Sequence, residues 1–301
     1  MTPDPSAAVR QRRFACTQCG ACCNRSPELE LSEAAALADV FVFRLMFRLY
    51  ELPRSYVAAR GGAGSAEEFY ESKRLLDTFA ARKSTKKYGQ GGKAIEYVQY
   101  LTVSALTLDA GAGACGALAA GRCTIYERRP LACRTLPFHY SRAEAAAEAN
   151  LDAFVASPGY RCDTTAAAPV VLEAGQILET EWRDARAEAL ERAGQDRRWR
   201  ELILRAMKTN AFGPSLPSLR DIEASAAFGA MTTSMRVAWQ IAAEAGLITK
   251  EQCAALVAAQ AEAIDRSLRG QCAPATRETL VEMRAEYREL LERVKGIEPS
   301  S

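Results

Sequence analysis

Residues 16–23 read Cys16-Thr-Gln-Cys19-Gly-Ala-Cys22-Cys23, and this stretch decides how the first half of the chain is expected to fold. A spacing of three residues lets successive thiolates curl around one centre while backbone N–H groups of the loop point toward the sulfurs. Gly20 allows the tight turn between the second and third cysteines. Cys22 and Cys23 are adjacent, so their side chains diverge, and we expect them to serve different centres. This density of cysteine predicts a metal or iron–sulfur site rather than inert packing residues or an isolated thioredoxin-like pair.

A second block of cysteines lies further along the chain and ends in a loop. Cys115 and Cys123 bracket a turn that contains glycine, and Cys162 lies in a loop sequence. Pro130 is expected at the first position of a short helix that carries Cys133. The two blocks together hold eight cysteines, enough for two sets of four.

Two arginines flank the cysteine of the expected short helix. Four thiolates on a dipositive ion leave a formal charge of about −2, which must be offset if the site is partly buried. Arg129 and Arg134 lie on either side of Cys133, and we expect their guanidinium groups to donate to sulfur.

The composition restricts the chemistry further. The chain has 301 residues, ten cysteines and one histidine, and its formal net charge is +2. Sites that need two histidine ligands, such as HExxH proteases, are therefore excluded. The lone His139 could ligate metal or act as a base for a cysteine, but its surroundings are more typical of a hydrogen-bonded histidine. Cys253 and Cys272 lie among Ala and Leu and are expected to pack in helices.

Both blocks together match a known pattern. The first reads Phe14-x-Cys16-x-x-Cys19-Gly20-x-Cys22-Cys23, and the second reads Gly121-Arg-Cys123-x-Ile-Tyr126-Glu-x-Arg129-Pro130-x-x-Cys133-Arg134-x-x-Pro137. In this order they resemble the YkgJ-type cysteine-cluster family, also called the CxxCxxCC family of zinc- or iron-chelating proteins. The resemblance covers about residues 14 to 163, and Cys115 and Cys162 fit the places of two further family cysteines. The Ala and Gly after Cys115 depart from the family, which more often has Pro-Phe-Leu there.

The resemblance implies metal or iron–sulfur binding, and it places Tyr126 beside the two arginines as a residue near the cofactor. Spacing favours an iron–sulfur cluster, of the 4Fe-4S type, over zinc, because CxxCxxC with a distant fourth cysteine is typical of ferredoxin ligation. One hypothesis assigns the metal ligands to two sets: Cys16, Cys19, Cys22 and Cys133; and Cys23, Cys115, Cys123 and Cys162. Mixed assignments remain open.

The expected fold class is mainly α: a loop-rich cysteine-cluster domain with a short β element, followed by a helical region. We place the cysteine-cluster domain at residues 14–165 and the helical region at 176–296, with flexible tails at 1–13 and 297–301. Within the domain, residues 31–52 and 65–82 are expected to be helices, and residues 96–108 one or two strands.

In the helical region, residues 231–245 are expected to form a helix that ends at Gly246. A capping box at Thr249 is expected to open the next helix, which stops near Gly270. Leu280, Met283, Tyr287, Leu290, Leu291 and Val294 form a stripe on a last helix.

Three function classes stay open: a metal-binding protein with a structural, carrier or redox role, a protein-modifying enzyme, and a metal-stabilised interaction module. The second follows from the resemblance, since similar domains occur in a flagellin lysine N-methylase. The expected partners are metal ions and a protein bound through the C-terminal helices. No signal-peptide or membrane-spanning stretch is found, so we expect a cytoplasmic protein. The basic stretch at residues 82–93 is interpreted as a solvated loop rather than a nucleic-acid site, because the chain is near neutral.

Overall fold

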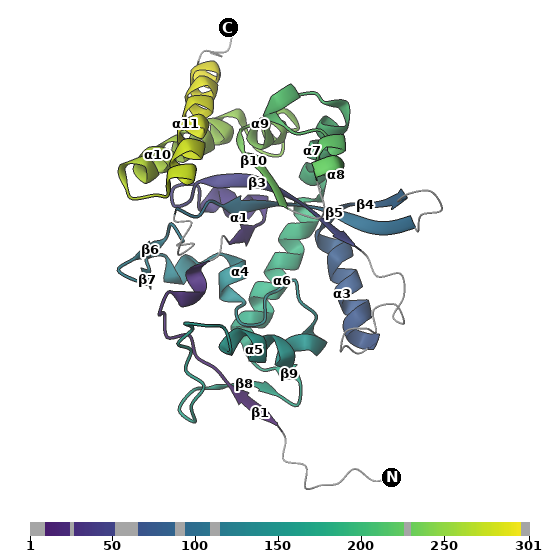
Figure 1. Ribbon diagram of the computed structural model, residues 1–301, viewed down its shortest axis with the longest axis vertical. Coiled ribbons are helices and arrows are strands. Elements are labelled where there is room, and N and C mark those ends of the chain that lie inside the picture. The colour runs from purple at the N-terminus through teal and green to yellow at the C-terminus, as the bar shows by residue number, and fades with distance from the viewer. Residues whose placement is uncertain are drawn as a thin grey trace.

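An antiparallel sheet lies across the middle of the molecule, with helices on both of its faces (Figure 1). The computed structural model describes residues 10–24, 27–51, 66–87, 94–108, 115–225 and 230–295. The strand order is β10-β3-β5-β2, and β4 also pairs with β5. Its strands are β2 (Glu28–Leu29), β3 (Phe43–Glu51), β4 (Ala80–Lys87), β5 (Ala94–Ala105) and β10 (Ala230–Ser234).

Strand β3 alternates between two environments, which explains why its sequence forms a strand. Phe43, Leu45 and Phe47 are buried in the main core, whereas Arg44 and Arg48 point to the opposite face. A period of two is the pattern of a strand with different environments on its faces. The predicted helix over residues 31–52 is therefore wrong beyond its first turns. Helix α1 covers only Leu31–Ala36.

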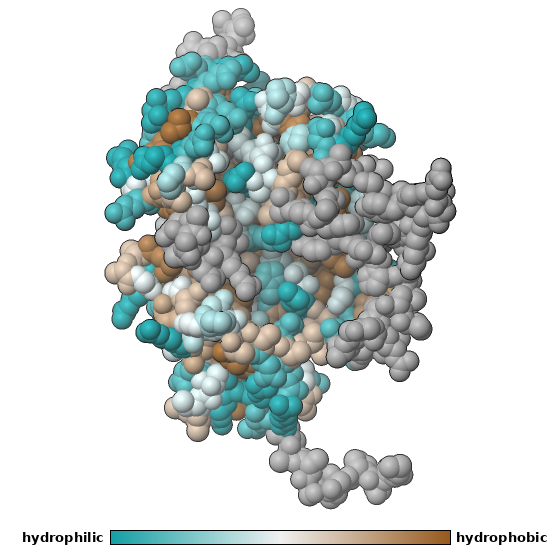
Figure 2. Space-filling model, viewed as in Figure 1, coloured by the Kyte–Doolittle hydropathy of each residue, from teal (hydrophilic) through white to brown (hydrophobic). Residues whose placement is uncertain are grey.

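Helices of the C-terminal part cover one face of the sheet. They are α7 (Arg197–Thr209), α8 (Leu219–Ser225), α9 (Arg236–Glu244), α10 (Lys250–Arg269) and α11 (Pro274–Lys295), with the short η4 (Gly213–Ser215) between α7 and α8. Trp199 and Trp239 are fully buried among them. The predicted stripe on α11 is used in the core, because Leu280, Met283, Tyr287 and Leu290 are buried. Hydrophilic residues cover most of the outer surface of this layer in the view of Figure 2.

The opposite face of the sheet is covered by α3 (Ala66–Phe79), α4 (Leu131–Arg134) and α6 (Thr180–Gln195). Below them lies a smaller unit with its own apolar cluster, which contains Phe14, Leu151 and Trp182 (Figure 1). Its elements are β1 (Gln11–Arg13), η3 (Glu144–Ala146), α5 (Ala147–Val155), β8 (Val170–Glu173) and β9 (Gln176–Ile177), and its strands form a sheet of order β1-β8-β9. Gln11–Arg13, predicted as part of a flexible tail, thus form a strand.

A buried polar triad joins the two halves of the chain. Arg200 of α7 is ion-paired with Glu30, which precedes α1, and it also donates to the carbonyl of Ala193. Asp196 accepts a hydrogen bond from the backbone N–H of Leu31. Arg200, Glu30 and Asp196 are 2%, 3% and 5% exposed. Burial, together with the neighbouring Asp196, raises the pKa of Glu30 to about 8.

Several sequence predictions are confirmed in this fold, and others change. Strand β5 overlaps the predicted strand segment 96–108 but begins two residues earlier, and Thr249 forms both bonds of the capping box of α10. Gly246 has the positive φ of 68° expected after a helix end. The predicted helix over residues 231–245 is wrong at its start, since β10 precedes α9. The second predicted helix ends at Phe79, and the chain continues directly into β4, so the residues read as a loop from Arg82 to Lys87 form a strand.

The fold class is confirmed in part: the N-terminal region combines helices with a β element, and the C-terminal region is helical. The β element is larger than expected, because residues 230–234 pair with β3 and extend the sheet. The boundary between residues 165 and 176 stays a prediction. Ser65 and the tail at 297–301 lie outside the described residues. No helix in the described segments is long and apolar enough to cross a membrane.

Candidate metal centre

The first cysteine motif folds as a loop and a short helical turn. Cys16 and Cys19 are exposed, and Cys22 and Cys23 lie in η1 (Ala21–Asn24), a 3-10 turn. Gly20 has a φ of +74°, which disfavours any side chain. The predicted tight turn between the second and third cysteines is therefore present.

The turn at Gly20 also packs against the second block. A Cβ atom at Gly20 would lie 2.5 Å from the carbonyl oxygen of Gly121, so only glycine fits this contact. Gly121 is in the turn between β6 (Leu118–Ala119) and β7 (Arg122–Cys123), where Ala120 and Gly121 both have positive φ. This is the predicted glycine turn between Cys115 and Cys123, and it is held against the first motif.

Backbone hydrogen bonds set which cysteines are neighbours. Ala15 and Asp163 exchange two backbone bonds of 2.8 and 3.0 Å, which brings the adjoining Cys16 and Cys162 side by side. The backbone N–H of Cys115 donates to the carbonyl of Cys23 at 2.9 Å. Cys16 is therefore next to Cys162, and Cys23 is next to Cys115.

All eight clustered cysteines line one cavity of about 1190 Å³. They are Cys16, Cys19, Cys22, Cys23, Cys115, Cys123, Cys133 and Cys162. None of the ten cysteines, all of which lie in the described residues, forms a disulfide bond. Residues far apart in sequence thus present their sulfurs to one space.

The thiols affect one another's ionisation. Burial is the largest cause of the raised pKa of Cys133, and the thiolate forms of Cys115, Cys22 and Cys123 add to it. Burial also raises the pKa of Cys162 to about 11, followed by the charges of Cys22, Cys16 and Cys19. Cys162 therefore lies near Cys16, Cys19 and Cys22, whereas Cys133 lies near cysteines of both blocks.

Two thiols of the first motif differ in their surroundings. The backbone N–H of Ala21 is the main cause that lowers the pKa of Cys19. A hydrogen bond with Cys22 is the main cause that raises the pKa of Cys23. Raised thiol pKa values are expected where thiols are buried together without a cation, and a bound metal ion reverses this effect.

The donor set fits a thiophilic metal such as zinc or iron, because eight thiols share the cavity. Within the described residues, however, no group of three or more Cys, His, Asp or Glu side chains is arranged as the ligands of one metal ion. Metal binding therefore requires side-chain rearrangement of the thiols around the cavity.

The helix that carries Cys133 is positioned by a buried carboxylate that sequence reasoning missed. The backbone N–H of Leu131 donates to Glu33 Oε1 of α1 at 2.5 Å. Glu33 is 7% exposed, and its other oxygen has no hydrogen-bond partner. Pro130 lies at the N-cap of α4, one residue earlier than predicted. Glu33 thus caps the first turn of this helix from another element.

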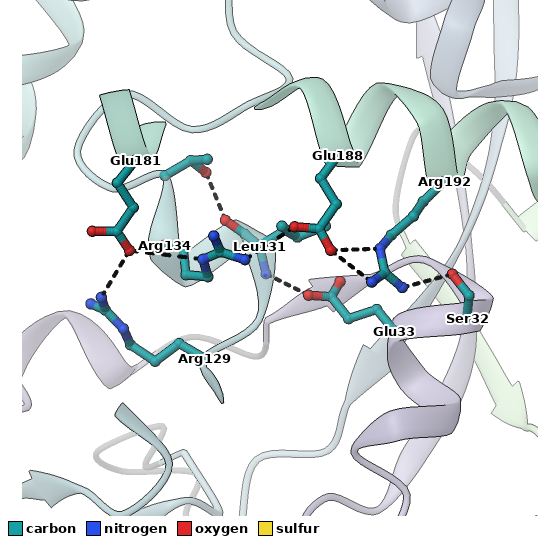
Figure 3. A network of polar contacts seen from close by, with 9 residues as sticks. Ser32, Glu33, Arg129, Leu131, Arg134, Glu181, Glu188 and Arg192 are labelled. Carbon is teal, nitrogen blue, oxygen red and sulfur yellow. Dashed lines mark hydrogen bonds and ion pairs between the residues drawn. The ribbon is translucent and has the colours of Figure 1, made fainter. Parts of the chain in front are cut away.

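The two arginines beside Cys133 contact carboxylates of α6, as Figure 3 shows. Arg134 donates to Glu188 at 3.1 Å, and both arginines lie 3.8 Å from Glu181. Glu188 also accepts two bonds from Arg192, whose third contact is Ser32 Oγ at 3.0 Å. The structure therefore connects these arginines to α6 and α1, where a direct contact with sulfur was predicted.

Tyr126 lies in the short 3-10 turn η2 (Tyr126–Arg128) at the edge of the cavity. The guanidinium carbon of Arg129 lies 3.7 Å from the centre of its ring, a cation–π contact. Burial raises the pKa of Tyr126, and a hydrogen bond with Cys16 raises it further. Tyr126 and Arg129 line the cavity, while Arg134 is not among the lining residues. Cofactor binding by these three residues stays a prediction.

The remaining candidates are now placed. His139 Nδ1 lies 2.9 Å from Ser141 Oγ, and its ring stacks on Tyr140 at 4.5 Å. Burial lowers the pKa of His139 to about 4, so the ring is neutral at pH 7. Cys253 is buried in α10, as expected. Cys272 packs against the main core, but it lies between α10 and α11, so its predicted helical position is wrong.

A family model described as "Putative zinc- or iron-chelating domain" matches residues 15–158. The matched segment is similar to this family, which is named CxxCxxCC. The resemblance noted in the sequence is thereby confirmed, and with it the general assignment of metal chelation. No curated protein and no solved structure matches the chain. The CxxCxxCC match ends before Cys162, which the structure nevertheless brings next to Cys16.

Proposed function

We propose that this protein holds two metal centres through its eight clustered cysteines, and that these centres are iron–sulfur clusters. The observation that carries the proposal is the convergence of all eight thiols on one cavity. Thiolates in a partly enclosed site are the usual ligands of iron–sulfur clusters and of structural zinc. A bound cluster would supply one-electron chemistry at these thiolates.

The proximity of the cysteines favours one division into two sets. The first set is Cys16, Cys19, Cys22 and Cys162, and the second set is Cys23, Cys115, Cys123 and Cys133. The backbone bonds that place Cys16 beside Cys162, and Cys23 beside Cys115, support this division. It exchanges Cys133 and Cys162 relative to the sets inferred from spacing alone.

Anaerobic purification followed by metal and acid-labile sulfide analysis tests the first part of the proposal. We expect iron and sulfide together, with a visible absorption that dithionite bleaches. Stoichiometric zinc without sulfide would show that the same cysteines hold zinc ions and not iron–sulfur clusters. A protein with neither iron nor zinc would refute metal binding by these thiols.

Single and double serine variants test the division into sets. If Cys16 and Cys162 share a centre, the Cys16→Ser/Cys162→Ser double variant loses no more metal than either single variant. The Cys133→Ser/Cys162→Ser double variant should lose the metal of both centres. Cys272→Ser is the matched control, because it lies outside the cavity and should keep the full metal content. Additive loss in the first pair would contradict the proposed sets.

The size of the cavity favours an enzyme as a second candidate function. Small-molecule sites are clefts of about 300–1,000 Å³ with a few polar groups, and this cavity is larger and lies directly beside the thiols. A sealed structural cluster needs no such space. Turnover that disappears in a metal-free preparation would support an enzyme, and a substrate bound without any reaction would contradict it.

A further inference from the structure

The central sheet supplies a wall of the cavity, on the face opposite to Phe43, Leu45 and Phe47. Arg44, Met46 and Arg48 of β3 line it, because alternate residues of a strand point to the same side. Ser104 of β5 lies opposite Arg44 in the sheet register and lines the same space. One wall of the cavity is therefore a sheet surface that carries two arginines.

The two arginines differ in whether a carboxylate neutralises them. Arg48 Nη1 lies 2.7 Å from Glu28 Oε1, so its charge is paired. Arg44 is half-buried, and its one side-chain hydrogen bond in the described structure goes to the carbonyl of Thr232 at 3.4 Å. Among the described residues no carboxylate forms an ion pair with Arg44. A half-buried guanidinium with one long bond to a carbonyl has unused donors.

No neighbouring charge in the described part of the chain stabilises the cationic form of Arg44. Burial is the cause that shifts its pKa, and burial lowers it. The guanidinium is therefore partly desolvated without an anionic partner among the described residues.

The other charged groups around the cavity add to this imbalance. Its described lining holds one carboxylate, Glu28, which is already paired. Arg129 is engaged with Tyr126 and Glu181, and Arg142 is exposed. A buried charge without a partner is costly, and an anion that enters the cavity would remove that cost at Arg44.

We propose that the cavity binds an anionic small molecule whose carboxylate or phosphate group is held by the guanidinium of Arg44, next to the hydroxyl of Ser104. Guanidinium groups bind both oxyanions through two parallel hydrogen bonds, which gives orientation as well as affinity. The volume of about 1190 Å³ leaves room for the rest of the ligand to extend toward the cysteines. This site does not depend on which metal the thiols hold.

Titration calorimetry tests the site with two probes, inorganic phosphate and succinate, at an ionic strength kept constant with chloride. We expect the protein as purified to bind at least one probe, and Arg44→Met to bind it about tenfold more weakly or worse, as expected for loss of a hydrogen bond to a charged group. Arg44→Lys should fall between them because an ammonium cannot form the bidentate contact. Phosphate binding alone indicates a phosphorylated ligand, and succinate binding alone indicates a carboxylate.

The control is Arg198→Met, which removes an exposed arginine of α7 outside the cavity and should bind like the unaltered protein. A melting curve without added anion separates binding from a structural role. Arg44→Met should melt at the same temperature or higher, because it removes an uncompensated charge. The proposal is overturned if neither probe binds, if Arg44→Met binds as tightly as the unaltered protein, or if this variant melts well below it.

Discussion

Replacing Arg200 with methionine should destabilise the protein by about 4 kcal/mol at pH 7. Arg200 is ion-paired with Glu30, and its charge also lowers the pKa of the neighbouring Asp196. Without the guanidinium, these two buried carboxyl groups lose their ion-pair partner, and the carboxylate that remains must take up a proton. Protonating a carboxyl of ordinary pKa 3.8 at pH 7 costs about 4 kcal/mol, since each unit of pKa is about 1.4 kcal/mol.

The same reasoning fixes the sign of the pH dependence. In the variant, the folded pKa of Asp196 is raised above its unfolded value, so folding takes up a proton and stability falls as pH rises. At pH 5 the cost is only about 2 kcal/mol, because protonation is then easier. The deficit of Arg200→Met should therefore halve between pH 7 and pH 5.

Urea denaturation at the two pH values measures both quantities. Arg198→Met is the matched control, since Arg198 lies on the same helix but is exposed, and it should change the free energy of unfolding by less than about 0.5 kcal/mol. The reasoning is refuted if Arg200→Met costs less than about 1 kcal/mol at pH 7, or if its deficit grows toward pH 5.

Three further predictions follow from the contacts described above. Gly20→Ala should lower stability and metal content together, because its Cβ would clash with a backbone carbonyl 2.5 Å away. In the control Gly121→Ala, the new Cβ meets nothing within 4 Å, so this variant should lose only about 1 kcal/mol of stability in chemical denaturation. Cys133→Ser should lose metal and stability together, because metal binding stabilises the fold at such sites. Cys253→Ser, which is outside the cavity, should keep its metal as measured by elemental analysis. Equal metal content in both variants would contradict the assignment of Cys133 as a ligand. Gln260→Ala should cost about 3 kcal/mol or more in urea denaturation, because the buried amide makes three bonds of 2.7–2.8 Å to the backbone of Ala38 and Phe41 and of Phe43, at the start of β3. A loss below about 1 kcal/mol would contradict this reasoning.

The turn within the first cysteine motif could be predicted from the sequence because the residues that form it are close together in the chain. Gly20, between Cys19 and Cys22, predicts a tight turn, and the structure has that turn with a positive φ. The neighbours of each cysteine could not be predicted, because they depend on contacts between distant segments. The pairing of Ala15 with Asp163 is one such contact, and nothing in the spacing of either segment indicates it.

Strand β3 shows why part of the fold was missed. Arg44 and Arg48 are four residues apart, which is also the spacing of one helix face. The alternation of Phe43, Leu45 and Phe47 is typical of a strand. These residues follow a helical segment, however, so the sequence also allows the helix to continue through them. The partner strands decide between the two, and β10 comes from a segment that itself resembled the start of a helix. The same alternation would have indicated that Arg44 points away from the core.

The strand pairings determine where this protein can be divided. A fragment trimmed to residues 15–158 would lack both β1 and its partner β8, and would also lack Cys162. It would lack β10 as well, so one side of β3 would be left with unpaired backbone groups. Such open strand edges template pairing between chains and lead to aggregation. The unit that recombinant expression must preserve is therefore set by the strands, and it extends from Gln11 to beyond Ser234.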